Sequence, residues 1–301
     1  MAEIKGSIVA LVTPFKNDNR EVDFELIEQL VNFHAENGTA AIVPCGTTGE
    51  SPTISPEEHI AIVKQVVKSA KGTELKVIAG TGSNSTAEAM EFTSEAQEAG
   101  ADACLIVVPY YNKPTPAGLK AHFSELNKID LPMVLYNIPG RTGINVSPKV
   151  TIEIAELCSN LIGVKASNGN LEEITELAIL NKGLSKPLSI LSGDDALTLP
   201  ICAVGGSGVI SVAANIVPQL MSEFVGNINS GNMEKARELN SIVFNFSKAL
   251  LSFGANPMGI KAVMNHAGYA VGGCRLPLTS LEEDQTRALV KIWEELKEKL
   301  G

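Results

Sequence analysis

The sequence has few aromatic residues, no long apolar run and no cluster of basic side chains. Only 5% of its 301 residues are Phe, Trp or Tyr. No window approaches the roughly 18 consecutive apolar residues that a membrane-spanning helix needs. The chain carries 24 basic and 34 acidic side chains, for a formal net charge of −10. Because nucleic acids and anionic membranes are bound by clustered Lys and Arg, neither is expected as the main partner. Small anionic ligands are not excluded, since a local site can bind them.

The sequence also lacks the patterns of disulfide-rich, metal-binding and nucleotide-binding proteins. Its five cysteines are widely spaced and form no C-x-x-C pair, so buried reduced thiols are expected. The four histidines are scattered, no H-E-x-x-H occurs, and neither a Walker loop nor G-x-G-x-x-G is present. A metal-dependent aldolase or hydrolase is therefore not expected. Glu3 stands where a signal peptide would carry positive charge, which predicts a cytoplasmic location.

What the sequence does contain is a regular alternation of short apolar runs with helical segments. Each run is rich in Val and Ile or continuously apolar, which is typical of parallel strands buried on both faces. Helix start signals lie between the runs, at Asp23, Ser55 and Ser147. Eight strands are predicted, beginning near Ser7, Ala40, Lys76, Ala103, Pro132, Leu161, Leu188 and Gly208.

Eight successive strand–helix units without a break in composition predict an α/β fold, a (β/α)8 TIM barrel over residues 1–225. Residues 226–301 carry only helical signals separated by Gly and Pro, and they predict a small C-terminal helical domain. The active site of such a barrel is built from the loops that follow the strands. The segments at those positions are 13–14, 46–50, 80–84, 109–112, 136–141, 165–167, 192–195 and 211–213.

Three of the four tyrosines fall at the predicted ends of two neighbouring strands. They are Tyr110, Tyr111 and Tyr136. A phenol can relay protons or donate a hydrogen bond to a developing oxyanion, so the cluster indicates acid–base chemistry. The alternative interpretation is that these aromatic side chains only pack the mouth of the barrel.

Two features nearby are suited to binding a carboxylate. Arg141 is the only arginine between Arg20 and Arg237, and its guanidinium can bind a carboxylate through two hydrogen bonds. An ordinary surface arginine is the alternative. The GTTG turn at residues 46–49 offers backbone N–H groups and two hydroxyls that could cradle a carboxylate. A plain turn explains that motif nearly as well.

Lys165 interrupts the apolar strand that begins at Leu161, and this places an amine in the mouth of the barrel with little water around it. Such surroundings disfavour the ammonium form and free the lone pair for attack on a carbonyl. Lys165 can therefore form a Schiff base. The alternative is a lysine that extends to solvent, as is expected for Lys76 at the opposite end of the barrel.

Six motifs together resemble one family, the dihydrodipicolinate synthases, now called 4-hydroxy-tetrahydrodipicolinate synthases. These motifs are GTTGE at 46–50, VVPYYNKP at 107–114, LYNIPGRTG at 135–143, IGVK at 162–165, SGDD at 192–195 and GVISVAAN at 208–215. The resemblance is collinear and covers nearly the whole chain. It extends to the superfamily of pyruvate lyases, which includes N-acetylneuraminate lyase. The narrower match rests on YYN at 110–112 and PGRTG at 139–143, because sialic-acid lyases generally lack that arginine.

The resemblance implies a Schiff-base enzyme that needs neither a metal nor an organic cofactor. Lys165 would condense with the keto group of pyruvate, and Thr47 and Thr48 would hold the pyruvate carboxylate. Backbone atoms around Gly193 and Ile210 would line the same pocket.

The resemblance also implies how protons and the second substrate are handled. Tyr136 would donate and accept protons, connected through Thr47 to Tyr111. In this family the relay tyrosine reaches the neighbouring subunit's site, so the enzyme would be at least a dimer and usually a tetramer of two tight dimers. Arg141 would bind the carboxylate of aspartate semialdehyde.

Lysine inhibits some members of the family by binding at the dimer interface. The residues that match that effector site are Ser51, His59, Asn84, Glu88 and Tyr110. Two prolines depart from the pattern, because Pro52 and Pro56 stand where many relatives carry a small residue and a second histidine. Another departure is Ala166, which directly follows Lys165 where many relatives place an acidic residue.

The leading hypothesis is the condensation of pyruvate with L-aspartate 4-semialdehyde, the first committed step of the diaminopimelate route to lysine. A related alternative is another pyruvate-dependent lyase, acting on N-acetylneuraminate or a different 2-keto acid, which would keep Lys165 and Tyr136 but would not need Arg141. An alternative of another class is a barrel that binds a keto acid without catalysis.

Overall fold

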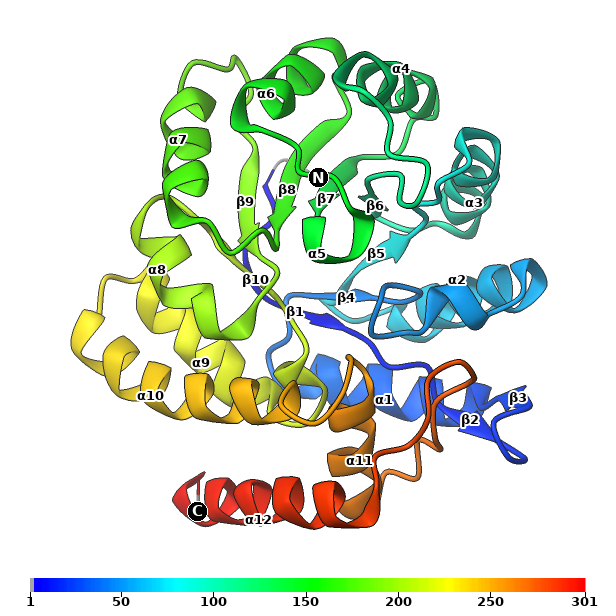
Figure 1. Ribbon diagram of the computed structural model, residues 1–301, viewed down its shortest axis with the longest axis vertical. Helices are drawn as coiled ribbons and strands as arrows, with labels where there is room; N and C mark the ends of the chain where they lie inside the picture. The colour runs from blue at the N-terminus through cyan, green and yellow to red at the C-terminus, as the bar shows by residue number, and fades with distance from the viewer. Residues whose placement is uncertain (1–2, 301) are drawn as a thin grey trace.

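The computed structural model of the chain describes residues 3–300, and its centre is a closed barrel of parallel strands (Figure 1). Within these residues the predicted (β/α)8 architecture is confirmed, and each of the eight strands begins within one residue of its predicted position. Strand β1 pairs with both β10 and β4, which closes the barrel. The order around it is β1 (Gly6–Ala10), β10 (Gly208–Ser211), β9 (Ser189–Ser192), β8 (Leu161–Ala166), β7 (Met133–Asn137), β6 (Ala103–Val107), β5 (Lys76–Gly80) and β4 (Ala41–Val43).

Helices surround the barrel, and three of them begin at the residues that the sequence indicates. Asp23 caps α1 by accepting a hydrogen bond from Leu26 N, and Ser55 and Glu58 form a reciprocal capping box at α2. Ser147 caps α6 in the same way as Asp23 caps α1. The outer helices are α1 (Phe24–Glu36), α2 (Pro56–Ala70), α3 (Thr86–Ala99), α4 (Pro116–Leu126), α6 (Pro148–Leu157), α7 (Leu171–Asn181), α8 (Thr198–Ala203) and α9 (Pro218–Asn229).

Several short elements were not predicted. A hairpin of β2 (Phe15–Lys16) and β3 (Glu21–Val22) follows β1, and the helical turn α5 (Pro139–Thr142) follows β7. Three 3-10 turns complete the set: η1 (Ser51–Thr53), η2 (Asp195–Leu197) and η3 (Ala213–Asn215).

The apolar core has two parts. Alternate strand residues point into the barrel, as at Ile8, Val134 and Leu191, and fill its interior. The remaining strand residues pack against the inner faces of the helices. The barrel is therefore a packed core rather than a pore, and a site at the barrel has to lie above the strand ends.

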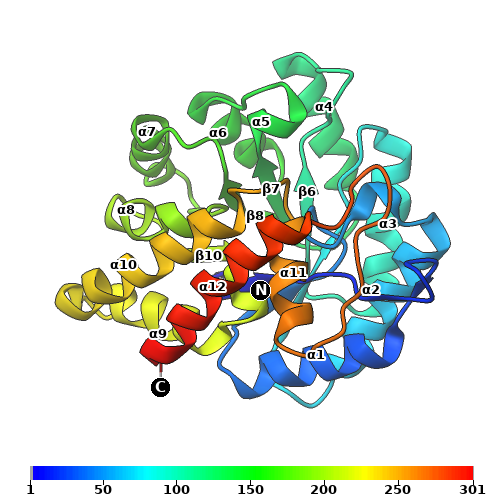
Figure 2. The same cartoon turned by 60° about the horizontal axis from the view of Figure 1, so that its bottom comes forward.

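Three C-terminal helices pack beside the barrel, α10 (Met233–Leu250), α11 (Met258–His266) and α12 (Glu283–Leu300). Figures 1 and 2 show α12 lying against α10 and α11, while α10 packs along α9 and reaches η2 at the mouth of the barrel. The expected division after residue 225 falls inside α9 and stays a prediction. Residues 1, 2 and 301, at the outer ends of the two predicted domains, lie outside the described part of the chain.

Across residues 3–300, no helix combines the length and the apolar character needed to span a membrane. The cytoplasmic location stays a prediction.

Candidate active site

Lys165 and Tyr136 lie next to each other at the carboxyl ends of neighbouring strands. Lys165 of β8 is paired in register with Tyr136 of β7 on one side and with Leu191 of β9 on the other. The Lys165 and Tyr136 side chains are each only 5% exposed. The amino nitrogen of Lys165 lies 4.1 Å from the centre of the Tyr136 ring. An amine and a phenol therefore share one buried site, which suits imine formation with proton transfer.

These two side chains line a cavity of about 210 Å³ above the strand ends. It is smaller than the roughly 300–1,000 Å³ of drug-sized pockets, so it suits a small substrate. Residues singled out in the sequence form much of its wall: Thr47, Thr48, Tyr136, Arg141, Lys165 and Gly193. The other lining residues are Ile138, Ser167, Asp194, Asp195, Val212, Ser247, Leu250, Leu251 and Asn256.

Gly193 lies so close to Lys165 that a side chain would not fit there. A Cβ at this position would lie 3.0 Å from Lys165 Cε and would overlap Ser167 Oγ. The main-chain N–H of Gly193 donates to Ala166 O at 2.8 Å, which fixes the loop against the end of β8. The glycine therefore leaves room for the lysine chain to reach the cavity.

Arg141 lies on α5 at the exposed rim of the cavity. Its Nη2 donates to the main-chain oxygen of Asn256 at 3.5 Å, a long contact, and within residues 3–300 the other guanidinium N–H groups make no hydrogen bond. The side chain of Asn256 contacts the 46–49 turn, where its Nδ2 donates to Thr48 Oγ1 at 2.9 Å. Asn256 thus links the predicted carboxylate-binding arginine to the predicted pyruvate-binding turn.

Two predicted site residues lie outside the cavity lining. Tyr111 is 89% exposed, and its left-handed backbone (φ 71°) holds it on the loop after β6. Ile210 of β10 is buried in the barrel interior with its side chain among the apolar residues there. The role that the resemblance gave to Ile210 concerns its backbone, and that role stays a prediction.

Sequence reasoning missed the part of the wall that comes from the C-terminal region. Leu250, Leu251 and Asn256 follow one another at the end of α10 and in the loop behind it. The sequence offered one signal for them, an Asn-Pro pair at 256–257 just after a long helical run, which marks a turn. Ser167 was also not assigned a role, although its buried hydroxyl has no hydrogen-bond partner within the described residues.

Asp195 is a buried carboxyl group beneath the cavity. Burial raises its pKa, while hydrogen bonds from Ser211 and from the backbone N–H groups of Ala213 and Val212 work against that shift. Both N–H groups donate to Asp195 Oδ2 at 3.0 Å. These bonds join η2 to the segment behind β10, so Asp195 holds two sides of the cavity floor together.

The five residues of the predicted effector site lie around the starts of α2 and α3. His59 of α2 donates from Nε2 to Gly80 O at 2.8 Å and stacks on Phe92, with 4.1 Å between the ring centres. Burial lowers the pKa of His59, and the hydrogen bond to Gly80 and the charge of Glu88 oppose that shift. Asn84 is joined to the loop of Tyr110 by Asn112, whose Nδ2 donates to Asn84 O at 2.8 Å. Ser51 begins η1.

A larger cavity of about 710 Å³ lies between α1, α9, α10, α11 and α12. It contains none of the side chains that carry the predicted chemistry, so its size does not make it the active site. Within residues 3–300, no group of three or more His, Cys, Asp and Glu side chains is placed to hold a metal ion.

A model of the dihydrodipicolinate synthetase family matches residues 3–296, the barrel and nearly all of the C-terminal helices. The chain belongs to this family. One relative is the 4-hydroxy-tetrahydrodipicolinate synthase of Methanocaldococcus jannaschii, which is 46% identical over 97% of this chain and 98% of its own.

Solved structures of dihydrodipicolinate synthases share the whole fold. The enzyme from Cyanidioschyzon merolae, with lysine bound, superposes with a TM-score of 0.93 at 40% identity, covering 97% of this chain and 98% of that one. The chloride-inhibited enzyme from Acinetobacter baumannii, complexed with pyruvate, gives a TM-score of 0.92 at 39% identity, covering 98% and 99%. Family and fold therefore agree with the resemblance seen in the sequence.

Proposed function

We infer that this chain is a 4-hydroxy-tetrahydrodipicolinate synthase, a lyase that condenses pyruvate with L-aspartate 4-semialdehyde in the diaminopimelate route to lysine. The observation that carries this proposal is the in-register pair of Lys165 and Tyr136 in one cavity with Arg141. The reaction requires an amine to form the imine, a group to carry protons and a group to bind a carboxylate. The amine, the phenol and the guanidinium would supply these three functions. Its curated relatives bear this name.

The first half of the reaction forms a nucleophile on Lys165. The neutral amine attacks the keto carbon of pyruvate, and loss of water with uptake of one proton gives a protonated imine. Loss of a proton from the methyl carbon then gives an enamine. Tyr136 lies against the amine and would carry these protons, and Thr47 and Thr48, which line the same cavity, would hold the pyruvate carboxylate.

The second half joins the two substrates and releases the enzyme. The enamine carbon attacks the aldehyde carbon of the semialdehyde, and the aldehyde oxygen takes up a proton. The amino group of the semialdehyde then attacks the imine carbon, which closes the ring and expels the amine of Lys165. Arg141 at the rim binds the carboxylate of the semialdehyde through its free N–H groups.

Borohydride trapping tests the imine. We expect pyruvate and borohydride to add one pyruvate-derived adduct to Lys165, seen by intact mass and peptide mapping. A chain that gains no adduct would be a binder rather than a Schiff-base enzyme.

The choice of aldehyde is tested by comparing acceptors in wild type and Arg141→Ala. We expect aspartate semialdehyde to be the preferred acceptor and its kcat/KM to fall about 100-fold in the variant, because a charge-assisted pair is lost. N-acetylmannosamine and other aldehydes are the acceptors that the alternative lyases would use. Full activity of the variant with aspartate semialdehyde would show that Arg141 does not bind it.

We also propose that Tyr111 completes the active site of a second copy of the chain. Its exposure on a loop held in a left-handed conformation supports a role outside its own cavity. The assembly would be a dimer or a pair of tight dimers. Mixing Lys165→Ala with Tyr111→Phe tests this, because a mixed dimer contains one site with both wild-type residues. Half of the dimers formed by random mixing are mixed, and one of the two sites in each is intact, so about a quarter of wild-type activity returns. If each Tyr111 acts in the site of its own chain, mixing restores no activity.

Feedback inhibition by lysine is a further proposal, supported by the cluster of His59, Glu88 and Asn84. Glu88 would pair with the ammonium group of the ligand. We expect inhibition at up to millimolar lysine that weakens in Glu88→Gln. Activity that does not change with lysine concentration over that range would contradict the proposal.

A further inference from the structure

The turn that carries Thr47 and Thr48 ends at Glu50, whose surroundings are unusual for a glutamate. The backbone of Glu50 is left-handed, with φ 59° and ψ 36°. Residues other than Gly, Asn and Asp rarely adopt this conformation. Its carboxylate is buried, away from solvent. A residue with a strained backbone and a buried charge persists only where its surroundings hold it in place.

Lys261 of α11 provides the positive charge that balances the buried Glu50 carboxylate. The Lys261 Nζ lies 2.6 Å from Glu50 Oε1, and the two side chains are only 2% and 1% exposed. The same ammonium group donates to Gly273 O at 2.8 Å and lies 4.1 Å from the centre of the Phe15 ring. Burial lowers the pKa of Lys261, and the charge of Glu50 opposes that shift.

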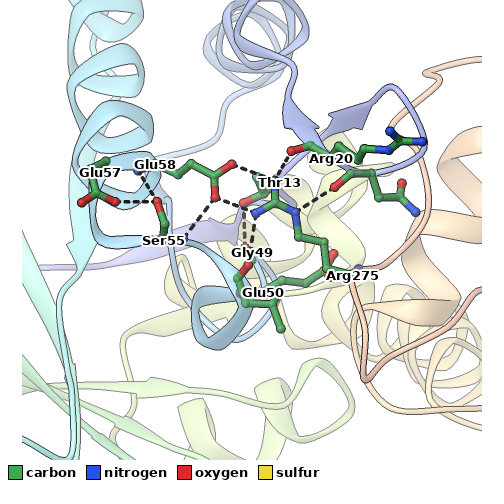
Figure 3. A network of polar contacts seen from close by, with 10 residues as sticks. Thr13, Arg20, Gly49, Glu50, Ser55, Glu57, Glu58 and Arg275 are labelled. Carbon is green, nitrogen blue, oxygen red and sulfur yellow. Dashed lines mark hydrogen bonds and ion pairs between the residues drawn. The ribbon is translucent and has the colours of Figure 1, made fainter.

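Arg275 contacts the other side of the same carboxylate. Its main-chain N–H donates to Glu50 Oε2 at 2.8 Å, and its guanidinium lies 4.3 Å from the centre of the Phe15 ring. The guanidinium holds Glu58 through two hydrogen bonds of 2.6 and 2.7 Å. Figure 3 shows Arg275 between Glu58 and the end of the turn at Gly49 and Glu50.

These contacts fix the shape of the turn itself. The N–H of Glu50 donates to Thr47 O at 3.1 Å, and Thr13 Oγ1 donates to Gly49 O at 2.7 Å. On the other side, Asn256 Nδ2 donates to Thr48 Oγ1. The segment from Asn256 to Arg275 therefore holds this turn at its threonine side chains and at its final carboxylate.

We propose that Lys261 is a positioning residue for pyruvate: through Glu50 it holds the 47–48 turn in the shape that binds the pyruvate carboxylate. The inference rests on the proposed function, because it gives Thr47 and Thr48 the role of holding that carboxylate. The C-terminal helices are then part of the pyruvate site, although Lys261 itself lines no part of its cavity.

The double variant Glu50→Gln/Lys261→Met tests the proposal, because it leaves no unpaired buried charge behind. We expect the pyruvate concentration for half-maximal borohydride trapping on Lys165 to rise about tenfold, with kcat at saturating pyruvate and the KM of the semialdehyde within about threefold of wild type. A purely structural pair would leave all three values unchanged in a folded variant, and that result would overturn the proposal.

Two further variants keep the test decisive. Lys120→Met breaks a pair with Glu153 on the outer helices that is about one-third exposed, and it should leave the half-saturating pyruvate concentration unchanged. If the double variant does not fold, Glu50→Asp replaces it, because it keeps the buried charge and shortens the link to Lys261, with an expected rise of about fivefold. An unchanged value in the folded single variant refutes the proposal, whereas failure of wild type to trap any pyruvate refutes the proposed function instead.

Discussion

The amino nitrogen of Lys165 lies against the face of the Tyr136 ring, 4.1 Å from its centre, on the neighbouring strand of the barrel. The contact is made by the ring face, so it does not depend on the hydroxyl group. Packing against the amine therefore rests on the ring, whereas the proposed transfer of protons rests on the phenol hydroxyl, and one substitution distinguishes them.

Tyr136→Phe keeps the ring and removes the phenol. We expect an unchanged melting temperature and a fall in kcat of about 100- to 10,000-fold, the usual contribution of a general acid or base. Steady-state kinetics and a thermal scan check this. Activity within about threefold of wild type would assign proton transfer to another group.

Gly193→Ala places a methyl group against Lys165. Because the new Cβ would lie 3.0 Å from Lys165 Cε and overlap Ser167 Oγ, we expect the lysine to shift. Its rate of trapping by pyruvate should fall by about 10- to 100-fold. Adding Ser167→Ala removes one of the two obstacles and should recover part of the rate.

Gly226→Ala is the matched control for that experiment. Gly226 lies inside α9 with no atom near the position of a Cβ, so the substitution should leave trapping unchanged and stabilise the helix by up to about 1 kcal/mol. Equal losses in both glycine variants would contradict a specific contact between residue 193 and the lysine.

Lys261→Met leaves the Glu50 carboxylate buried without a counterion. We expect a loss of about 3–5 kcal/mol in the free energy of unfolding, which is typical of breaking a buried pair from one side. Adding Glu50→Gln should recover much of that loss, because the unpaired charge is then gone. Urea titrations of the two single variants and the double variant measure the coupling, and additive losses would mean that the pair contributes nothing as a pair.

Acid stability should depend on two buried histidines. Burial lowers the pKa of His34 to about 3 and that of His122 to about 4. Below pH 6.5 the unfolded chain takes up protons that these folded groups do not, so the free energy of unfolding falls as the pH falls. In His34→Asn the slope between about pH 4.5 and 5.5 should decrease by about 1.4 kcal/mol per pH unit.

The same variant at about pH 7.5 provides the reference for that experiment, because the imidazole is then largely neutral in both states. Any loss of stability there reports the packing and the hydrogen bond between His34 and Thr39. Parallel curves for wild type and variant across the acidic range would show that His34 does not titrate on unfolding.

The sequence was sufficient for the strands and for the residues at their ends, because both signals are local. Apolar runs bounded by Gly and Pro located the eight barrel strands to within one residue, and the barrel then placed Lys165, Tyr136 and Arg141 at one rim. The hairpin of Phe15–Lys16 and Glu21–Val22 was missed because strands of two residues are too short to show alternation.

Long-range polar contacts could not be predicted from the sequence, for a different reason. Asn256 and Thr48 are 208 positions apart, and nothing in either segment identifies the other. Lys261 in the sequence is simply a lysine within a helical run, and only the fold shows that its side chain is buried. Tyr111 is exposed, so its proposed contact with a second copy of the chain cannot be read from a pattern within one chain.

The pairing of β1 with β10 also delays closure of the barrel while the chain is being made. Gly6 is paired with Gly208, so the first strand leaves the ribosome long before its second neighbour exists. Lys165 emerges earlier than the last strand, and Asn256, which lines the cavity, emerges later than both. The wall of the cavity is therefore complete only after the last strand and Asn256 have left the ribosome, so the barrel cannot close on a chain that is only partly made.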